Sequence, residues 1–455
     1  MSALVSLIKI LGEEKVLKKQ EDLHVYGYDA TAGIGNKKPL AVVFPESTED
    51  VVAVVNWANE FKIPLFPRGS GTNLSGGTVP VVPGVVVELN GLNRILEIDL
   101  ENLTATVEPG VIINDLNEAI KPYGLIYPPD PGTVTTATIG GSVAECSGGL
   151  RGLKYGVTKH YIMGIEAVIG TGEVIKFGGK TVKNVTGYDL TALMVGSEGT
   201  LGIITKVIVK LVPAPAARRS FMAIFHDIDR AGKAIAEIIK NRVIPATLEI
   251  MDQTTIRTVE KFKKIGLPVE AEALLLVETD GYPEQVETEA KIIKKVLEEN
   301  QGQVFEAEDE KDREKLWEAR RAALPALAQV SPTTVLEDAT VPRSKIPEML
   351  KKLKEISQKY NIIIGTFGHA GDGNLHPTIL TDETNREEWE RVEKAVEEIF
   401  KAALELGGTL SGEHGIGMAK NRFLSWELGN EGVNLLKRIK LAFDPNNLLN
   451  PGKMA

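Results

Sequence analysis

The alternation of apolar and polar positions divides the first half of the chain into short strands and helices. Residues 40–69, LAVVFPESTEDVVAVVNWANEFKIPLFPRG, read as strand, helix and strand, with Ser47 as the helix N-cap and Asp50 three residues later. This pattern predicts a βαβ unit. Further strands are predicted at 84–89, 95–100 and 104–110, a helix at 113–123, and a closing strand in LGIITKVIVKLVP, residues 201–213.

The second half repeats one pattern twice after a Pro- and Ala-rich linker at residues 212–220. Residues 221–252 and 271–308 each read as strand, helix and strand. Two such units in succession favour an antiparallel sheet covered by helices on one side, an α+β domain distinct from the first. We expect domains at 1–213 and 214–425 and a C-terminal segment, 426–455, that returns to the first domain.

Composition narrows the classes of function. The 455 residues carry 52 Lys and Arg against 62 Asp and Glu, a net charge of -10, which argues against nucleic acid as the main partner. The single cysteine, Cys146, excludes an internal disulfide and leaves too few thiolates for an iron–sulfur cluster. Residues 1–19 read as an amphipathic surface helix, and no apolar run has the length of a membrane span. We therefore expect a cytoplasmic protein with no membrane span.

Three glycine clusters lie in the first domain. They are PRGSGTNLSGG at 67–77, PPDPGTVTTATIGGSVAECSGGLRGLKYG at 128–156 and GSEGTLGI at 196–203. Such runs let backbone N–H groups converge on an anion and suit a large, flat ligand with phosphates. None matches the common nucleotide fingerprints, so tightly packed or flexible turns remain a second interpretation of the glycines alone.

Two histidines flank a turn signal in FGHAGDGNLHPTIL, residues 367–380. Asp372-Gly373 is a preferred pair for a two-residue turn, and strict antiparallel pairing then sets His369 opposite His376. Side chains opposed in this way have Cβ atoms about 4.5–5.5 Å apart, which lets two imidazoles bind one ion. Glu413 and His414 follow in SGEHGIGMAK, so a metal site with an open position for substrate is indicated beside the plainer interpretation of a structural histidine pair.

Together these motifs, with the terminal FDPNNLLNPGK, resemble the FAD-linked 2-hydroxyacid dehydrogenases of the vanillyl-alcohol oxidase superfamily, in the branch of glycolate oxidase FAD-binding subunits and D-lactate dehydrogenases. The resemblance runs in order from about residue 40 to the C-terminus. It implies a two-lobed FAD-binding domain of the vanillyl-alcohol oxidase type and a ferredoxin-like antiparallel-sheet cap domain. It also implies the oxidation of a small D-2-hydroxy acid, D-lactate or glycolate, to the 2-oxo acid.

The resemblance also implies which residues bind the cofactor. The FAD pyrophosphate would be held by Arg68, Gly69, Ser70, Gly71, Thr72, Asn73, Gly76 and Gly77. The flavin and its phosphates would be lined by Pro131, Thr138, Gly140, Gly141, Ser147 and Gly148, and the ribose and adenine by Glu198, Gly199 and Ile203, with Asn450 contributing from the terminal motif. Relatives with covalent flavin carry a histidine in the first glycine loop, and this loop has none, so we expect non-covalent FAD.

For the chemistry, the resemblance implies that His369, His376 and Glu413 bind one divalent transition metal, zinc, iron or manganese, that His414 is the base, and that Arg320 binds the substrate carboxylate. Sequence alone does not separate the roles of Glu413 and His414, and Arg320 also fits an ordinary helix-surface ion pair. Leu324, one helical turn after Arg320, favours a small monocarboxylate.

Because the chain offers no iron–sulfur or haem ligands, a separate electron-acceptor protein is implied, such as an electron-transferring flavoprotein or companion flavin and iron–sulfur subunits. Two other functions remain open. One is a metal-dependent hydrolase without flavin, and the other is a flavin-carrying subunit whose catalysis resides in a partner.

Overall fold

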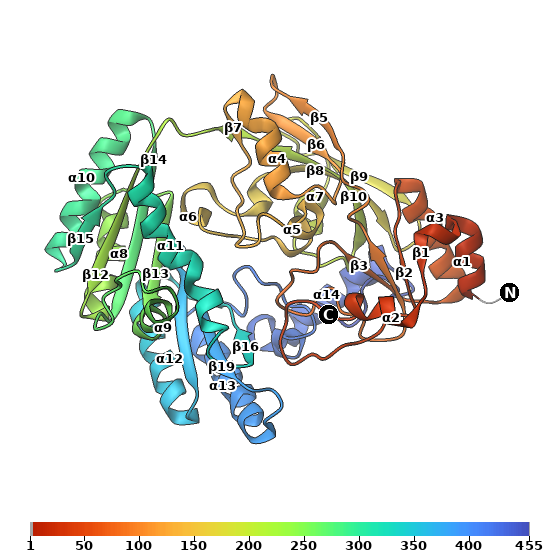
Figure 1. Ribbon diagram of the computed structural model, residues 1–455. Helices are drawn as coiled ribbons and strands as arrows, with labels where there is room; N and C mark the ends of the chain where they lie inside the picture. The colour runs from red at the N-terminus through yellow and green to blue at the C-terminus, as the bar shows by residue number, and fades with distance from the viewer. Residues whose placement is uncertain (1–2, 455) are drawn as a thin grey trace. The chain divides into compact units, whose positions relative to one another are not determined.

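The computed structural model describes residues 3–454 and resolves two compact units (Figure 1). The first comprises the chain up to Gly148, Val157–Ala214 and the chain from Glu413 onward, and the second comprises Gly149–Gly156 and Pro215–Gly412. We expected the second domain to extend to residue 425. Residues 413–425 group with the first unit instead, because Ser75 and Glu198 of that unit accept hydrogen bonds from the backbone of residues 416–419.

A small four-stranded sheet opens the first unit, in the order β1-β2-β4-β3. Its elements are α1 (Ala3–Leu11), β1 (Val16–Leu17), α2 (Gln20–Leu23), β2 (Ala41–Val43), α3 (Thr48–Phe61), β3 (Leu65–Arg68) and β4 (Val85–Glu88). Ser47 is the N-cap of α3, as predicted, and its Oγ accepts from the Asp50 N–H at 3.1 Å. β4 is parallel to both β2 and β3 and lies between them, so the strands of the predicted βαβ unit are not neighbours.

The N-terminal helix is shorter than the predicted amphipathic segment. Its described part begins at Ala3, and residues 1–2 lie outside the described range. Leu7 and Leu11 are buried in the core beside α3. Within residues 3–454, none of the helices has the length and hydropathy needed to cross a lipid bilayer.

A five-stranded antiparallel sheet, in the order β5-β6-β10-β8-β9, forms the rest of the first unit together with short helices. The elements of this part of the chain are β5 (Ile95–Asp99), β6 (Thr104–Val107), α4 (Ile113–Ile120), β7 (Leu125–Ile126), α5 (Ile139–Glu145), β8 (Ile162–Ile169), β9 (Val174–Gly178), α7 (Leu190–Met194), β10 (Gly202–Lys210) and β11 (Val212–Pro213). β7 and β11 pair with each other in a separate two-stranded sheet. The predicted helix at 113–123 ends as an α-helix at Ile120 and continues as a 3-10 turn.

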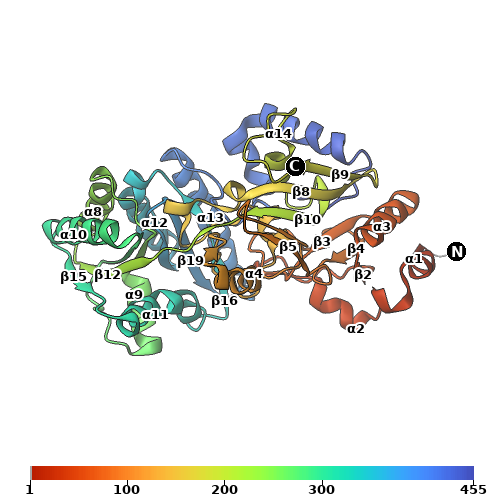
Figure 2. The same cartoon turned by 90° about the horizontal axis from the view of Figure 1, so that it is seen from above.

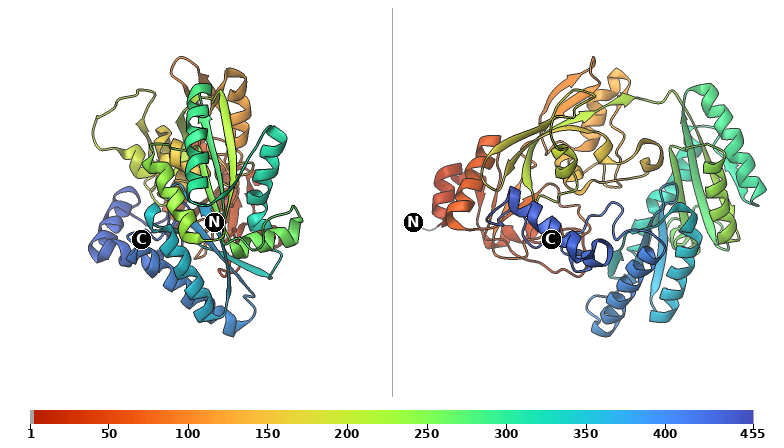
Figure 3. Two further views of the ribbon diagram at one scale, coloured as in Figure 1. Left: turned by 90° about the vertical axis from the view of Figure 1, so that its left-hand side faces the viewer. Right: turned by 180° about the vertical axis from the view of Figure 1, so that it is seen from behind.

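The last helix, α14 (Leu424–Phe443), belongs to the first unit and is seen best from behind (Figure 3). After it, the terminal motif runs beside β3. Leu65 N–H donates to Leu448 O at 2.8 Å, and Asn450 N–H donates to Leu65 O at 2.7 Å. The C-terminal motif is thereby fixed next to the strand that leads into the first glycine cluster.

The second unit is built on one eight-stranded antiparallel sheet, in the order β15-β12-β14-β13-β18-β19-β16, with β17 also paired to β19. Its strands are β12 (Ala217–Phe225), β13 (Thr247–Asp252), β14 (Ala273–Gly281), β15 (Gln303–Glu306), β16 (Thr333–Leu336), β17 (Ala339–Thr340), β18 (Ile363–His369) and β19 (Asn374–Thr381). Its helices are α6 (Gly152–Tyr155), α8 (Ile228–Lys240), α9 (Gln253–Lys263), α10 (Pro283–Glu299), α11 (Glu310–Leu327), α12 (Ile346–Tyr360) and α13 (Arg386–Glu405). This confirms the predicted antiparallel-sheet domain.

Helices cover both faces of this sheet, so the expectation of one covered face was wrong. On β14, Leu275 and Val277 pack with α8, α10, α12 and α13, while Leu274 and Leu276 point the other way and pack with α9 and α11. Figure 2 shows the two helix layers on either side of the strands. The physical reason is visible in the sequence of β14, where an uninterrupted apolar run replaces the alternation of a half-exposed strand.

Candidate functional site

The first glycine cluster forms the loop that follows β3 in the first unit. The N–H groups of residues 70–74 make no hydrogen bond within the described part of the chain, whereas those of Ser75 and Gly77 donate to Asn73 Oδ1 at 2.9 and 2.7 Å. The Asn73 side-chain nitrogen is buried and has no partner among the described residues. Successive uncommitted N–H groups beside a buried amide are what a loop needs to bind a phosphate.

Arg68 stabilises this loop. Its Nη1 donates to Tyr28 O at 2.7 Å and to Thr78 Oγ1 at 3.1 Å, and its side chain passes close to Gly71. Gly71 has a φ of +69°, and a Cβ there would lie 2.0 Å from Arg68 Nη2, so a larger residue would be strained and would displace the guanidinium. The guanidinium is therefore used to shape the loop.

The second glycine cluster contains α5, which Thr138 caps. Thr138 Oγ1 accepts from Gly141 N–H at 3.1 Å, and Gly140 N–H donates to Pro109 O at 2.7 Å. These two N–H groups are used within the protein and are not available to a phosphate. A Cβ on Gly140 would lie 2.5 Å from Pro109 Cβ, so close packing explains that glycine.

The other predicted residues of this cluster lie on either side of α5. Ser147 Oγ bonds the hydroxyl groups of Ser142 and Thr158, and Pro131 lies on the partly exposed loop before the helix. Gly148 is buried, and a Cβ there would lie 2.5 Å from a carboxylate oxygen of Glu413. A larger residue at Gly148 would displace that carboxylate.

The third cluster is the turn before β10. Glu198 is buried and its N–H donates to Ala144 O at 2.8 Å, while Gly199 has a φ of +68° and packs against Pro67. Ile203 belongs to the hydrophobic core. Sequence reasoning placed all three near the ribose and adenine, and that assignment stays a prediction.

Tertiary structure brings the three clusters and the terminal motif together in the first unit. Gly69 lies against Thr138, which joins the first cluster to the second. Asn450 Nδ2 donates to Gly77 O at 2.9 Å and to Glu198 O at 2.6 Å, which joins the first to the third. Asn450 Oδ1 is buried without a partner among the described residues. The uncommitted polar groups on this assembly fit a dinucleotide cofactor.

The histidine hairpin of the second unit has a register different from the predicted one. His376 pairs with Phe367, and His369 pairs with Asn374, so the expected pairing of His369 with His376 was wrong. The loop has four residues, 370–373, because Gly373 N–H closes a turn onto His369 O at 3.0 Å and Gly371 N–H bonds Leu248 O on β13. The observed partner of His376, Phe367, lies two residues before the predicted partner, His369. Because side chains alternate between the two faces of a strand, a shift of two residues leaves both imidazoles on one face.

The two imidazoles are in contact, with ring centroids 5.0 Å apart and a nitrogen of each within 4.8 Å of the other. Both are buried in the second unit. Glu249, on β13, was not singled out from the sequence. Its Oε1 lies 2.6 Å from His369 Nδ1, so the carboxylate orients the imidazole through that nitrogen.

Glu249 also holds Arg320 of α11. Arg320 Nε donates to Glu249 Oε2 at 2.6 Å, and the guanidinium lies over the Phe367 ring, 4.6 Å from its centroid. No described residue accepts a hydrogen bond from Nη1 or Nη2 of Arg320. Burial opposes ionisation of Glu249, but His369 and Arg320 together lower its pKa below the ordinary value. A glutamate between the apolar residues Leu248 and Ile250 of this strand was the available sequence signal.

Glu413 and His414 belong to the first unit, and His414 is buried. The residue before them, Gly412, is fixed within the second unit, where its N–H donates to Asp338 Oδ2 at 2.7 Å and its Cα packs beside Asn374 on β19. The role of Glu413 as a third metal ligand and of His414 as the base stays a prediction.

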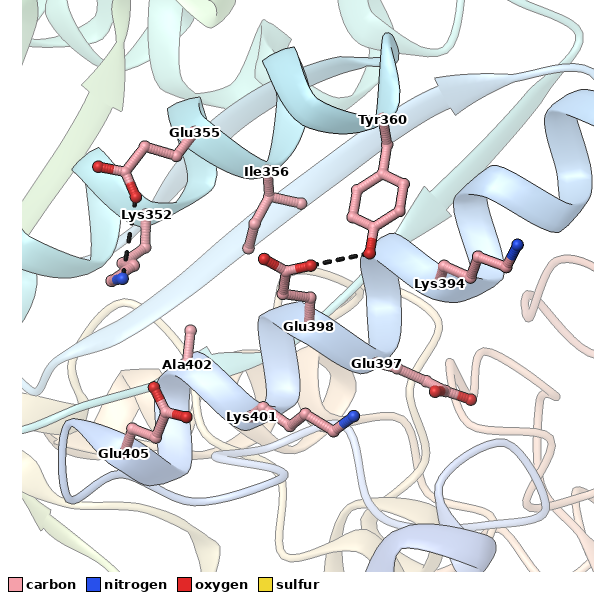
Figure 4. A pocket seen from close by; sticks show the side chains of 10 residues that line it. All are labelled: Lys352, Glu355, Ile356, Tyr360, Lys394, Glu397, Glu398, Lys401, Ala402 and Glu405. Carbon is pink, nitrogen blue, oxygen red and sulfur yellow. Dashed lines mark hydrogen bonds and ion pairs between the residues drawn. The ribbon is translucent and has the colours of Figure 1, made fainter.

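A separate groove of about 360 Å³ lies between α12 and α13 of the second unit (Figure 4). Its walls carry Lys and Glu side chains. Lys352 lies 3.8 Å from Glu355, and the Tyr360 hydroxyl donates to Glu398 at 2.8 Å. It contains none of the predicted site residues. The groove is therefore not the candidate site.

Sequence and fold match known proteins over nearly the whole chain. Residues 39–178 match the FAD binding domain, and residues 214–454 match the C-terminal domain of FAD linked oxidases. Glycolate oxidase subunit GlcD of Bacillus subtilis (strain 168) is 51% identical over 98% of this chain and 95% of that protein, and D-lactate dehydrogenase of Anaerostipes hadrus is 36% identical over 99% and 97%. The crystal structure of p-cresol methylhydroxylase with substrate bound shares the fold, with a TM-score of 0.82, 22% identity and coverage of 99% of this chain and 96% of that one.

Proposed function

Since the chain belongs to the family of FAD-linked oxidases, we propose that it oxidises a small D-2-hydroxy acid, D-lactate or glycolate, to the 2-oxo acid. Membership confirms the resemblance inferred from the sequence motifs and identifies the chain as an FAD-linked oxidoreductase. It also removes the alternative of a hydrolase without flavin.

The environment of Arg320 is the main structural observation that supports a carboxylate-bearing substrate. This arginine has 12% side-chain exposure, its Nε is held by Glu249, and the Phe367 ring fixes the plane of the guanidinium. Both Nη groups remain available, and two parallel N–H donors in one plane are what a carboxylate accepts best. In an ordinary surface ion pair, these Nη groups would donate to a neighbouring carboxylate instead.

Two bound groups would complete the site. FAD would be held non-covalently by the first glycine loop and its neighbours in the first unit, and a divalent metal, zinc, iron or manganese, by His369, His376 and Glu413. When bound, they supply the redox acceptor and the Lewis acid of the reaction.

The chain's own residues do the remaining work. Arg320 would orient the substrate through its carboxylate, and neutral His414 would accept the proton of the substrate hydroxyl on a ring nitrogen. Glu249 would keep His369 in the tautomer whose Nε2 is free of hydrogen. Leu324 follows Arg320 by one helical turn, and its apolar side chain favours a short substrate without a second carboxylate.

A separate protein would take the electrons from the reduced flavin. The chain has one cysteine and therefore cannot bind an iron–sulfur cluster of its own. The relative from Bacillus subtilis is named as a subunit, which supports an acceptor in the form of companion subunits, with an electron-transferring flavoprotein as the second candidate.

Anaerobic bleaching of the flavin tests this function. The purified chain alone is expected to bleach with D-lactate or glycolate and to bleach far more slowly with L-lactate. His414→Ala should keep its FAD but bleach about a hundredfold more slowly or worse, because a general base contributes about 10²–10⁴ in rate. His226→Ala, at an exposed histidine of the second unit, is the control and should bleach like the wild type.

Three results would contradict the proposal. A lone chain that retains FAD but is bleached by no 2-hydroxy acid would favour the remaining alternative, a flavin carrier whose catalysis resides in a partner. Wild-type bleaching by His414→Ala would remove the proposed base. Full activity in protein shown by elemental analysis to contain no metal would remove the proposed metal.

A further inference from the structure

Glu198 directs all of its hydrogen-bonding groups into the first unit. Its Oε1 accepts from Ile416 N–H and its Oε2 from Gly417 N–H, each at 2.6 Å. Its own N–H donates to Ala144 O at 2.8 Å, and its carbonyl accepts from Asn450 Nδ2 at 2.6 Å. Every polar atom of this residue therefore already has a partner within the first unit.

The backbone at Glu198 is strained. Its φ of +52° lies in the left-handed region, which residues with a Cβ rarely adopt. Such conformations persist where the surroundings over-determine them, and they cluster at functional sites. Here the two hydrogen bonds to the carboxylate are the interactions that a glycine at this position would lose.

The loop that receives these bonds is the one that carries Glu413 and His414. Its next two residues, Met418 and Ala419, both donate to Ser75 O of the first glycine loop at 3.0 Å. A Cβ on Gly417 would lie 2.1 Å from the same Ser75 oxygen, so the two loops are packed directly on each other. Residues 416–419 are thus held by Glu198 on one side and by the predicted FAD loop on the other.

Glu198 lies beside a second carboxylate at this loop. Glu145 is its acidic neighbour, and both carboxylates pack against Gly415, the residue after His414. Burial, and after it the nearby Glu198, raise the pKa of Glu145 well above its ordinary value. Burial raises the pKa of Glu198 as well, while the Ile416 and Gly417 N–H groups, and after them Lys420 and Lys453, favour its charged form.

We propose that Glu198 is a positioning residue of the reaction, whose carboxylate fixes the 415–417 turn and thereby the orientation of the His414 imidazole. This inference rests on the proposed role of His414 as the base. In this role Glu198 supports proton transfer by positioning the base, whereas the sequence motif predicted that it binds the cofactor.

Glu198→Gln is the first test. The amide keeps the shape of the side chain but offers one oxygen and directs its NH₂ group at the second N–H donor. FAD content and the visible flavin spectrum are expected to stay as in the wild type, while the rate of anaerobic bleaching falls at least about tenfold, or about 1.4 kcal/mol of barrier, with an unchanged half-saturating substrate concentration. Glu198→Asp, which keeps the charge but is one methylene too short to reach both donors, should also lose rate.

A solvent isotope effect separates positioning from a general loss of structure. If His414 is displaced, transfer of the hydroxyl proton becomes slower relative to hydride transfer. The ratio of bleaching rates in H₂O and D₂O should then be larger in Glu198→Gln than in the wild type. Glu108→Gln is the matched control. Glu108 is a buried carboxylate of the same unit, and it accepts a hydrogen bond from the Arg94 backbone N–H at 2.8 Å. Both residues are distant in sequence from the 415–417 turn. It should leave the ratio unchanged.

The outcomes separate this inference from the proposed function. If His414→Ala bleaches like the wild type, the base assignment fails and takes this inference with it. If His414→Ala is inactive while Glu198→Gln bleaches normally, only this inference is overturned. Loss of FAD or of folded protein in both Glu198 variants, or a slower rate without a larger isotope effect, would also overturn it in favour of a structural or cofactor-binding role.

Discussion

At the scale of single residues, Glu249 connects the His369 imidazole and the Arg320 guanidinium of the second unit. It is 1% exposed, and removing a carboxylate from water is unfavourable unless its oxygens are satisfied. Here one oxygen meets His369 and the other meets Arg320, each at 2.6 Å. One buried charge therefore sets the tautomer of the imidazole and the direction of the guanidinium at once.

Glu249→Gln is expected to weaken both functions. The amide has a single oxygen, so either His369 or Arg320 loses its acceptor. Loss of an orienting partner of a metal-binding histidine lowers metal affinity by about 10–100-fold. Metal titration of the metal-free protein should show this decrease, and flavin bleaching should need more substrate for half-saturation.

Glu278→Gln is the matched control for that substitution. Glu278 is also a buried carboxylate of the same sheet and accepts from Arg313 Nε at 2.7 Å and from Ser220 Oγ at 2.6 Å, but it contacts no predicted site residue. It should reduce stability and leave metal affinity unchanged. Equal metal affinities in Glu249→Gln and the wild type would contradict the orienting role.

At the scale of elements, α9 follows β13 directly and packs with α11 on one face of the eight-stranded sheet. Asp252 ends β13 and is the N-cap of α9, with its Oδ1 accepting from Thr255 N–H at 2.8 Å. Burial raises the pKa of Asp252 to about 6, despite the hydrogen bonds that favour its charge. The cap is therefore partly protonated in the folded state at mildly acidic pH.

Asp252→Asn should reveal this as a pH-dependent difference in stability. Because the folded-state pKa is raised, the stabilisation from protonating Asp252 is complete below about pH 4 and is lost as the pH rises through about 6. Asn caps a helix about as well as Asp and does not titrate. The stability of the wild type relative to the variant should therefore fall by up to about 3 kcal/mol between pH 4 and pH 7. Urea unfolding of both proteins measures it, and a difference that does not change with pH would contradict the raised pKa.

At the scale of the whole molecule, each unit has a hydrophobic core of its own, and the chain passes between the units after residues 148, 156, 214 and 412. Every residue predicted to bind FAD lies in the first unit, whereas His369, His376 and Arg320 lie in the second. Glu413, the third proposed metal ligand, lies in the first unit. FAD binding is therefore expected to stabilise the first unit, whereas the proposed metal has ligands in both units.

Removal of FAD should lower the melting temperature of the first unit. A ligand that binds only the folded state adds about 4 kcal/mol of stability at a thousandfold excess over its dissociation constant. Calorimetry of the flavin-free protein should show one lowered transition, restored by added FAD. Since the cofactor is proposed to be non-covalent, acid precipitation should release the yellow colour into solution, and colour kept by the precipitate would contradict this.

The sequence by itself determined the local elements and the fact that both histidines of the hairpin lie on the same face of the sheet. Ser47 caps α3 as predicted because the side chain of an N-cap bonds an N–H three residues away. The register prediction at His369 and His376 was wrong by two residues, yet both side chains stay on one face, because the strand repeats every two residues. The glycine motifs likewise identified the FAD-linked family, since the positive φ of Gly71 and Gly199 and the close packing of Gly140 on Pro109 constrain the residue type itself.

Only the tertiary structure decided which residues support the site. β4 enters between β2 and β3, and a second helix layer covers the far face of the eight-stranded sheet; both depend on packing between distant segments. Glu249 meets His369 across 120 positions of sequence, and Glu198 meets Ile416 across 218. Neither pair has a spacing that a local pattern can record, because a buried carboxylate is placed by partners that the chain brings to it only on folding.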